Sequence, residues 1–581
     1  MRGWTGRIVV AVLFVVVLVL PLAWSRPEVS APRGGRTLII ISPHNEQIRY
    51  EVERAFSAWH AEKYDEAVDI NWRNLGGTSD IERILKSRYT ALAKGGKLED
   101  GVGMDMVFGG GDYFFDVQLK GGIEAPIVGD GGIVETQRVS LTEPVTIDPA
   151  VLAAAYPEPL IADKMLYEPD GHWYGIVLAS FGIVYNHDVL NARGLPVPRT
   201  WSDLTDFHYE GWMALADPSH SGSVRVTYDA ILQRYGWERG MHTLRRVFAN
   251  ARYFAPNASK VPTDVSYGNA AAGMCIDFYG RYQSQKIGGG KRVGYVAPAG
   301  ATVVTADPIA VLRGARNKEV AVRLIEFLLS VEGQAIWNFP KDDPMGPAQF
   351  ELRRAPIRVD MYEQYLDRMI DQVNPFVDIA KPLAEGTPSY FSVVPTLMHA
   401  MCMDIHADLN AAWVAIERTD DPVKKAAMPA EFDRLPTTDI AEVWRDVPAD
   451  GPSAERLAKW YDTHRYALAR MQWAADTLGE EHIVAACAGL SDLIEQLRRT
   501  IDEPGALPTD FADRYRHQHQ QVERMIGAMA DHERMIDFQT ALLTMRRPLW
   551  KKFSWAEDAD RRRWTAFFKD QYRKVIALSK E

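Results

Sequence analysis

The fold is decided near the start of the chain, where residues 37–46 read Thr-Leu-Ile-Ile-Ile-Ser-Pro-His-Asn-Glu. The β-branched, apolar residues 37–41 predict a buried strand, and the polar residues 42–46 predict a tight turn that leads into a helix. Apolar residues recur at Ile48, Val52, Phe56 and Trp59. Because this spacing puts them on one face, residues 46–64 are predicted to form an amphipathic helix.

The same succession of strand, turn and helix continues along the chain. Residues 68–72 are predicted to form a second strand, which leads through the turn 76–80 (Gly-Gly-Thr-Ser-Asp) into a predicted helix at 81–92. A third predicted strand, at 104–108, ends on Gly-Gly-Gly-Asp at 109–112. This alternation predicts a parallel sheet with right-handed crossovers. Ligands of such sheets bind beyond the carboxyl ends of the strands, which is where the three turns fall.

A fourth polar turn, residues 217–223 (Asp-Pro-Ser-His-Ser-Gly-Ser), follows a predicted strand at 213–216. Turns of this composition leave backbone N–H groups unpaired at helix N-termini, and those groups suit an anion or a polar small molecule. Each Ser or Thr could instead simply cap its own helix. Four such turns favour one shared cleft, with three turns on a first lobe and the fourth on a second.

The remaining sequence completes this second lobe and returns to the first. Two apolar runs at 174–178 and 182–185 flank Ala179-Ser180-Phe181. Further strands are predicted at 270–279 and 292–296, and residues 300–307 lead back to the first lobe. Helices are predicted at 227–235, 241–249 and 320–330.

Beyond about residue 345 loops continue to residue 395, and the chain is then mostly helical. Long helices are predicted at 454–477, 480–501 and 512–547, as in a hairpin or small bundle. The predicted units are an export segment or anchor at 1–25, a linker at 26–36, lobe 1 at 37–172 with 298–345 returning to it, hinge strands and lobe 2 at 173–297, a C-terminal wrap at 346–400, and a helical extension at 401–581.

The N-terminus has the layout of a secretory signal. Arg2 and Arg7 precede an apolar run at residues 8–24, and Ala23-Trp24-Ser25 offers the small residues that a signal peptidase needs. The run is about as long as a minimal membrane span, so an uncleaved anchor is the alternative. No Cys follows it, which argues against a lipoprotein. In either case the rest of the chain is predicted to lie outside the cytoplasm, in the periplasm.

Composition narrows the class of partner. The 581 residues include 66 Lys and Arg and 77 Asp and Glu, a net charge of -11, which argues against nucleic acid as the main partner. Cys275, Cys402 and Cys487 are too few and too scattered for a disulfide framework and are predicted to be buried hydrophobes. His399, Cys402 and His406 fall at i, i+3 and i+7 of a predicted helix, a weak candidate for a metal site.

Residues of about 37–345 resemble bacterial periplasmic solute-binding proteins of the ferric-ion-binding type, a branch that includes polyamine, thiamine and phosphonate binders. The resemblance rests on the order and spacing of segments at 38–46, 105–111, 174–186, 198–204, 216–218, 306–311 and 326–334. It implies a two-lobed α/β fold of type II-like periplasmic binding proteins, joined by crossing strands around 173–185, with the ligand clamped in the cleft and delivered to an ABC permease. The helical C-terminal region is an all-α addition to that pattern.

The resemblance also bears on the ligand. Ferric binders complete their metal site with two adjacent tyrosines, and the matching position here is Phe278-Tyr279. Tyr279 keeps a phenol but Phe278 cannot ligate, which moves the interpretation from ferric ion towards a solute that carries an oxyanion. His44, Glu46 and Tyr279 remain the candidate metal ligands.

The candidate ligand-binding residues combine hydroxyls, amides, glycine N–H groups and carboxylates. They are Ser42, His44, Asn45, Gly77, Thr78, Ser79, Gly110, Gly111, Asp112, Ser180, Ser221, Gly222, Ser223, Asp277, Tyr279 and Asp307. An anionic solute would use the hydroxyls and the helix N-termini. A cationic headgroup would instead pair with Asp112, Asp277 or Asp307.

No motif in the sequence supplies catalysis. The run Gly-Gly-Gly-Lys at 288–291 lacks the ending of a phosphate-binding P-loop and is predicted to be a hairpin loop, and no Gly-x-Ser-x-Gly elbow occurs. We therefore expect a non-enzymatic solute-binding protein for ABC import, without a cofactor unless ferric ion is itself the ligand. The alternative is a membrane-anchored sensory or scaffold protein whose solute-binding fold carries a helical interaction domain.

Overall fold

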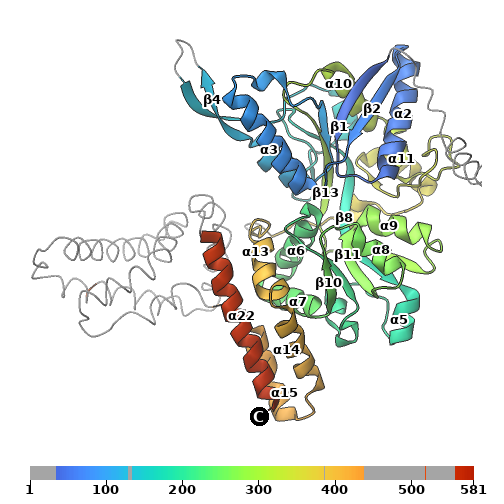
Figure 1. Ribbon diagram of the computed structural model, residues 1–581. Coiled ribbons are helices and arrows are strands. Elements are labelled where there is room, and N and C mark those ends of the chain that lie inside the picture. Colours follow the sequence, from blue (N-terminus) through green and yellow to red (C-terminus); the bar gives the residue numbers. More distant parts are fainter. Residues whose placement is uncertain (1–34, 129–133, 385–386, 437–516, 518–555, 581) are drawn as a thin grey trace, which may run out of the picture.

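The computed structural model describes residues 35–128, 134–384, 387–436, 517 and 556–580. Two α/β lobes are joined through β8 and β13, and C-terminal helices lie against the lower lobe (Figure 1). In the described part of the chain, a ten-stranded sheet runs through both lobes in the order β10-β9-β11-β8-β13-β3-β1-β2, and β12 and β14 also pair with β8. The predicted two-lobed α/β fold is confirmed.

Lobe 1 is built from the strand–helix alternation at the start of the chain. β1 pairs in parallel with β2 and β3, as the alternation predicts, whereas β13 runs antiparallel to β3. The main elements of the lobe are β1 (Arg36–Ile41), α2 (Glu46–Tyr64), β2 (Val68–Arg73), α3 (Thr78–Lys94), β3 (Met106–Phe108), β13 (Val304–Val311), α10 (Lys318–Leu329) and α11 (Val331–Asn338).

Shorter elements extend lobe 1 between β3 and β8. They are a π-helical turn (Phe114–Lys120), the hairpin strands β4 (Ile123–Val128) and β5 (Val134–Val139), α4 (Pro149–Ala155), β6 (Leu160–Ile161) and β7 (Lys164–Met165). The β4–β5 hairpin projects from the upper lobe beside α3 (Figure 1).

β8 (Tyr174–Asn186) carries the chain from lobe 1 into lobe 2, and every residue of this strand is buried. Its residues up to Ser180 pair with β13 of lobe 1, whereas those from Phe181 onward pair with β11 (Ala272–Ile276) of lobe 2. The lobes therefore meet inside one strand, between Ser180 and Phe181. The predicted unit at 173–297 thus begins with residues that pair in the sheet of lobe 1.

Lobe 2 holds the rest of the sheet and its covering helices. Its elements are α5 (His187–Arg193), β9 (Met213–Ala216), α6 (Gly222–Tyr235), α7 (Trp237–Ala249), β10 (Ala251–Ala255), α8 (Lys260–Ser266), α9 (Asp277–Lys286) and β12 (Val293–Val296), with 3-10 turns at Trp201–Thr205 and Phe207–Tyr209. The predicted strand at 270–279 is too long, because Asp277 already begins α9. Residues 288–291 connect α9 to β12, so the predicted hairpin loop is a helix-to-strand connection instead.

The C-terminal helices share the hydrophobic core of lobe 2. Trp413, Phe432, Phe568 and Tyr572 belong to the same buried cluster as the residues of β9 and α7. The elements after α11 are β14 (Ala355–Pro356), α12 (Val359–Tyr365), a 3-10 turn (Leu366–Arg368), π-helical turns at Pro375–Ile379 and His399–Met403, α13 (Val394–Met398), α14 (His406–Arg418), α15 (Pro422–Asp433) and α22 (Ala556–Lys580). The described part of the predicted extension at 401–581 is therefore continuous with lobe 2. The helices predicted at 454–477 and 480–501, and all of 512–547 except residue 517, lie outside the described residues.

Arg245 of α7 lies at the junction between lobe 2 and these helices and is fully buried. Its guanidinium carbon is 5.3 Å from the ring centre of Phe568 and 5.6 Å from that of Phe432. It also donates to the carbonyl oxygen of Phe432. Aromatic faces and a carbonyl oxygen thus replace water around this cation, which ties the C-terminal helices to the lobe.

Two sequence predictions concern targeting and cysteines. Within the described ranges no helix is long and apolar enough to cross a membrane. Residues 8–24, the predicted signal or anchor, lie outside those ranges. Cys275 and Cys402 are free and buried, as predicted, and Cys487 is outside the described residues.

Candidate functional site

A cavity of about 510 Å³ lies between the two lobes. Residues of all four polar turns line it, together with the first turn of α9 and residues of β13. Its size suits a small organic solute, because most small-molecule pockets hold roughly 300–1,000 Å³. The three turns of lobe 1 and the turn of lobe 2 thus meet at one site.

Most of the predicted ligand-binding residues line this cavity. They are His44, Asn45, Gly77, Thr78, Gly110, Gly111, Ser221, Gly222, Ser223, Tyr279 and Asp307. The other predicted ligand residues, Ser42, Ser79, Asp112, Ser180 and Asp277, do not line it, and neither does the predicted metal ligand Glu46.

The residues outside the cavity have local structural contacts or face away from it. Ser42 is fully buried, and its Oγ accepts the backbone N–H of His44 at 3.1 Å. The carboxylate of Asp112 accepts the backbone N–H of Tyr113 at 2.8 Å. Glu46 is exposed in the first turn of α2. Ser42 and Asp112 therefore stabilise the turns that carry the lining residues.

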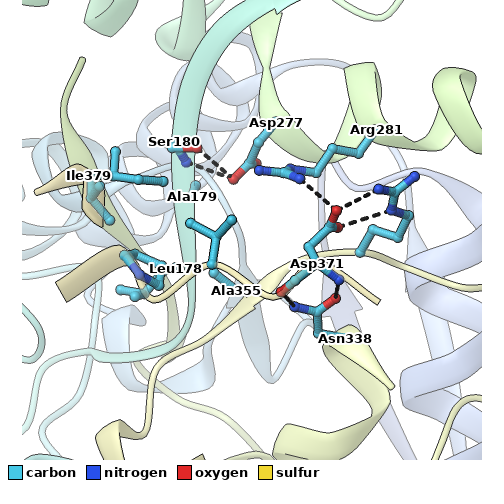
Figure 2. A pocket seen from close by; sticks show the side chains of 13 residues that line it. Leu178, Ala179, Ser180, Asp277, Arg281, Asn338, Ala355, Asp371 and Ile379 are labelled. Atoms are coloured by element: carbon cyan, nitrogen blue, oxygen red, sulfur yellow. Dashed lines mark hydrogen bonds and ion pairs between the residues drawn. The ribbon is translucent and has the colours of Figure 1, made fainter. Parts of the chain in front are cut away.

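Ser180 and Asp277 lie instead at a second cavity of about 20 Å³, shown in Figure 2. The N–H and Oγ of Ser180 donate to Asp277 Oδ2 at 2.8 and 3.1 Å. Side chains alternate between the two faces of a strand, so Ala179 and Phe181 line the large cavity while Ser180 does not. The small cavity has room for about one water molecule and belongs to the packing between the lobes.

Two helix N-termini, one from each lobe, meet in the lining of the large cavity. α3 begins after Gly77 and α6 after Ser221, and neither N-cap residue bonds a backbone N–H of its helix through a side chain. A Cβ placed on Gly222 would lie 3.0 Å from Thr78 Oγ1, and one on Gly77 would lie 3.0 Å from the carbonyl oxygen of His220. The two ends therefore approach as closely as glycine allows. Their N–H groups and helix dipoles together favour a negatively charged group.

A buried charge cluster forms the lobe 1 wall of the site. Asp307 Oδ2 lies 2.9 Å from His44 Nε2 and 2.6 Å from Arg354 Nη2. Asp307 Oδ1 accepts the backbone N–H of Gly110 at 3.1 Å. His44, Asp307 and Arg354 are 3%, 5% and 0% exposed. The carboxylate thus fixes the glycine turn and is itself paired with a guanidinium.

The protonation states of this cluster follow from burial and pairing. Burial opposes ionisation of Asp307, but Arg354 and His44 outweigh it and hold the pKa of the carboxyl well below its usual range. Burial lowers the pKa of His44 in spite of Asp307. His44 is therefore neutral near pH 7, and the negative charge of Asp307 is compensated by Arg354.

The aromatic pair at 278–279 performs two different roles. Phe278 stacks over the guanidinium of Arg354, with 4.5 Å between the ring centre and the guanidinium carbon. Tyr279 lines the cavity, and burial together with Asp307 raises the pKa of its phenol to about 12. Tyr279 is consequently a protonated phenol that can donate a hydrogen bond, and Phe278 shields the buried ion pair from solvent.

The predicted metal site is not assembled in the described residues. Glu46 is exposed and does not line the cavity, and His44 Nε2 faces Asp307. The described ranges contain no group of three or more His, Cys, Asp or Glu residues that could hold a metal ion. This also overturns the weak candidate at His399, Cys402 and His406: His406 Nε2 bonds the Phe248 carbonyl at 3.0 Å, while His399 faces Asp217.

Sequence reasoning missed several polar residues of the site. They are Asn74, His220, Asn257, Ser259 and Thr305 in the lining, and Arg354 behind it. Asn74 follows the carboxyl end of β2, so the rule that ligands bind at strand ends could have found it. Asn257 and Ser259 follow β10, a strand that the sequence did not reveal. Arg354 lies in a loop where no pattern distinguishes it from its neighbour Arg353.

Part of the chain is similar to a known protein family. Residues 138–356 match the family model described as bacterial extracellular solute-binding protein. This part of the chain is therefore similar to a bacterial extracellular solute-binding protein. The match spans β8, all of lobe 2 and β13, and it ends at β14. The predicted relationship to extracellular solute-binding proteins is thus confirmed, and the family consists of binding proteins.

Curated relatives are similar over only part of their length. The phosphoglycerate transport regulatory protein PgtC of Salmonella typhimurium is 29% identical over 161 residues, which cover 28% of this chain and 39% of the relative. A protein of Haemophilus influenzae without an assigned function is 26% identical over 168 residues, or 29% of this chain and 48% of that one. The chain therefore spans less than half the length of the relatives it matches.

Solved structures show a loose likeness. The periplasmic binding protein AfuA from Actinobacillus pleuropneumoniae, with fructose-6-phosphate bound, has a TM-score of 0.41 at 17% identity and covers 55% of this chain and 91% of its own. Iron-bound HitA from Pseudomonas aeruginosa has a TM-score of 0.41 at 18% identity, with 60% and 92% covered. At this level of similarity neither structure indicates which ligand this chain binds.

Proposed function

We propose that this protein captures a small organic anion that carries a phosphate-like group between its lobes, outside the cytoplasm, and delivers it to an ABC permease. The observation that carries the proposal is the meeting of the uncapped N-termini of α3 and α6 across the cavity. An anion held there would contact N–H groups of both lobes at once, so that its binding favours the closed arrangement.

The side chains of the lining favour an anion over a cation. Thr78, Ser221 and Ser223 supply hydroxyl groups at the two helix ends. Asp307, the carboxylate at the centre of the site, is already neutralised by Arg354, so little negative charge remains for a cationic headgroup. Asp277 is held at the small cavity by Ser180. The other described carboxylate of the lobe 1 lining, Asp80 in the first turn of α3, is paired with Arg83 at 2.7 Å.

His44 indicates a further feature of the ligand. Its Nε2 lies 2.9 Å from the ionised carboxylate of Asp307 and 3.4 Å from Arg354 Nη1, and the shorter contact, to the carboxylate, favours a proton on this nitrogen. Among the described residues its Nδ1 is buried without a hydrogen-bond partner. This nitrogen is then an acceptor that a ligand hydroxyl would satisfy. A phosphate ester that also carries a free hydroxyl fits both parts of the site.

The name of the Salmonella relative agrees with this class of ligand. That protein is described as a phosphoglycerate transport regulatory protein. Because the match covers a minor part of both chains, it serves here to select probes. 3-Phosphoglycerate carries a phosphate, a carboxylate and a hydroxyl, and it is the first compound to test.

A thermal-shift and calorimetric screen of the full chain tests the proposal. The probes are 3-phosphoglycerate, fructose 6-phosphate, inorganic phosphate, Fe(III), putrescine and thiamine. A ligand that binds only the folded protein stabilises it by about 2.7 kcal/mol at a hundredfold excess over Kd, so the melting midpoint rises. We expect a rise with the phosphate esters and a smaller one with inorganic phosphate.

Two variants locate the binding site in the same screen. Ser221→Ala and Thr78→Val remove hydroxyls from the two facing helix ends and are expected to weaken phosphate-ester binding severalfold each. Ser202→Ala, in the 3-10 turn Trp201–Thr205 away from the cavity lining, is the matched control. A rise with putrescine or Fe(III) alone would overturn the proposed ligand class, and a rise that neither variant reduces would overturn the proposed site.

A further inference from the structure

The cavity-lining turn of lobe 2 is held by a histidine from the C-terminal helices. His399 begins the π-helical turn His399–Met403, and its Nε2 lies 3.2 Å from Asp217 Oδ1. Its Nδ1 lies 3.0 Å from Asp404 Oδ1. π-helical turns are rare in proteins, and those that occur often lie at functional sites. One imidazole therefore bridges the turn at 217–223 and the helices that follow it much later in the sequence.

Arg561 extends this connection to α22, the last helix of the chain. Its Nη2 donates to Asp404 Oδ1 and its Nε to Asp404 Oδ2, each at 2.8 Å. The hydrogen bond to Asp217 raises the pKa of His399, so the imidazolium form is favoured. Asp217, His399, Asp404 and Arg561 then alternate in charge, an arrangement that neutralises each member and fixes its orientation. We call these four residues the His399 relay.

Asp217 also determines the shape of the turn itself. Its Oδ1 accepts the backbone N–H of Ser219 at 2.7 Å. Arg225 of α6 donates to the carbonyl oxygens of Pro218 at 2.5 Å and Ser219 at 3.1 Å. The next residues, 220–223, line the cavity. A shift of Asp217 therefore changes the position of groups that would contact the ligand.

The same region contacts the opposite lobe. Phe391, just before α13, packs against Tyr113, which follows the glycine turn of lobe 1, with 4.2 Å between the ring centres. The guanidinium of Arg225 lies 5.6 Å from the Phe391 ring. Separation of the lobes would break the contact between Tyr113 and Phe391 and would release one side of Arg225. Arg225 thus contacts both the turn at 217–223 and Phe391, the residue that packs against the opposite lobe.

We propose that the His399 relay couples the turn at 217–223 to α22, so that the C-terminal helices report whether the cleft is closed. The two states of the coupled element are the closed and open arrangements of the lobes. The coupling itself is a property of the turn and the helices. Its use as a ligand signal rests on the proposed function.

Coupling is reciprocal, so it is measured first without any ligand. The experiment is hydrogen–deuterium exchange of the full chain, with peptides that cover residues 217–223. Arg561→Gln is expected to speed exchange there at least threefold, because the relay loses its last cation. Phe568 and Tyr572 keep α22 packed in the core of lobe 2 in this variant.

Arg562→Gln is the matched control, since Arg562 is exposed on the same helix and the substitution removes the same charge. It is expected to leave exchange at 217–223 unchanged. Asp217→Asn tests the relay from the other end and is expected to speed exchange at residues 556–563 at least threefold. If Arg561→Gln and Arg562→Gln affect residues 217–223 equally, or if Asp217→Asn leaves residues 556–563 unchanged, the relay carries no coupling and the proposal is overturned.

A second arm adds 3-phosphoglycerate. In the wild type we expect protection at the start of α6 and altered exchange at residues 556–563. In Arg561→Gln the first effect should persist and the second should fall by at least threefold. Protection of α6 without any response of α22 in the wild type would overturn the coupling. Absence of protection at α6 would count against the proposed ligand, while the ligand-free variants still decide the coupling.

Discussion

Each lobe brings an uncapped helix N-terminus to the cavity, and each also has a cavity-lining turn that is held in a different way. In lobe 1 the glycine turn is held by Asp307, which is buried with its partners His44 and Arg354. In lobe 2 the turn at 217–223 is held by His399, which is half-buried and belongs to the C-terminal helices. A buried cluster is rigid because any unpaired member is costly, whereas a partly exposed relay can rearrange.

Because of this difference, we expect the two lobes to have different roles in ligand binding. The lobe 1 wall is a fixed receptor surface whose charges are balanced before the ligand arrives, which lowers the cost of ordering it on binding. The lobe 2 wall is connected to helices that lie outside the cleft. We therefore expect closure to change contacts mainly on the lobe 2 side.

The largest effect is expected from Arg354→Met. The variant leaves the carboxylate of Asp307 buried without its main cation, and breaking one partner of a buried pair costs about 3–5 kcal/mol. Urea denaturation of the ligand-free protein measures this loss of unfolding free energy. The double variant Arg354→Met with Asp307→Asn removes the stranded charge and should recover at least half of the loss. Equal stability of the single variant and the wild type would show that the cluster is not what fixes lobe 1.

A smaller effect, on binding alone, is expected from Gly222→Ala. The added Cβ would lie 3.0 Å from Thr78 Oγ1 and so would hold the facing helix ends apart only when the lobes are closed. We expect at least tenfold weaker binding of 3-phosphoglycerate, about 1.4 kcal/mol, with little change in the melting midpoint of the free protein. Gly95→Ala is the control, because a Cβ there meets only an ordinary contact at 3.5 Å. Unchanged affinity in Gly222→Ala would mean that the ligand is held without close approach of the two helix ends.

The strands and turns of lobe 1 that line the cavity can be predicted from the sequence, because they depend on patterns among neighbouring residues. Alternation of apolar runs and polar turns located β1, β2 and β3, and the rule of strand ends placed His44, Thr78 and Gly110 in one site. These features follow from periodicities within a few turns of chain. The match of predicted and observed bounds is closest there, with α2 at 46–64 as predicted.

The remainder depends on contacts between distant residues. Arg354 meets Asp307 only because the chain after α11 returns to the lobe junction, and no local pattern encodes that return. The neighbours of Ser180 in the sequence predict that it contacts the ligand, yet side-chain alternation along β8 directs it to the other face of the strand. The sequence indicates His399 only as a weak metal candidate, because its partner Asp217 lies in the turn at 217–223, far away in the chain.

An intermediate effect on stability is expected from pH at His399. Its pKa is raised, first by Asp217, so its contribution is complete below the unfolded pKa of about 6.5 and is lost as pH rises through the folded value. Burial opposes ionisation of Asp217, but His399 and the Ser219 N–H lower its pKa to about 2, so it stays ionised throughout. The other charged groups that face the imidazole are Asp404 and Arg561.

The measurement compares wild type and His399→Gln by urea denaturation between pH 5.5 and 9. The wild type should be more stable by about 1 kcal/mol at the acidic end, and the difference should shrink towards pH 9. His208→Gln is the control, because His208 is exposed and does not line the cavity. A difference that grows with pH would mean that the neutral imidazole is the form that stabilises the fold.

The smallest effect is expected from Tyr279→Phe, which separates the two ligand classes. With a pKa raised to about 12 the phenol is protonated, so towards an anion it can contribute at most one hydrogen bond from the lobe 2 side. A hydrogen bond to an uncharged oxygen of the ligand, such as its hydroxyl, is worth about 0.5–1.5 kcal/mol, and for that bond we expect threefold weaker binding of 3-phosphoglycerate. A ferric site would behave differently, because the phenolate would be a ligand and its removal would abolish any Fe(III)-dependent rise in melting midpoint. If Tyr279→Phe abolishes an Fe(III)-dependent rise in melting midpoint and the wild type binds no phosphate ester, the lobe 1 wall belongs to a metal site.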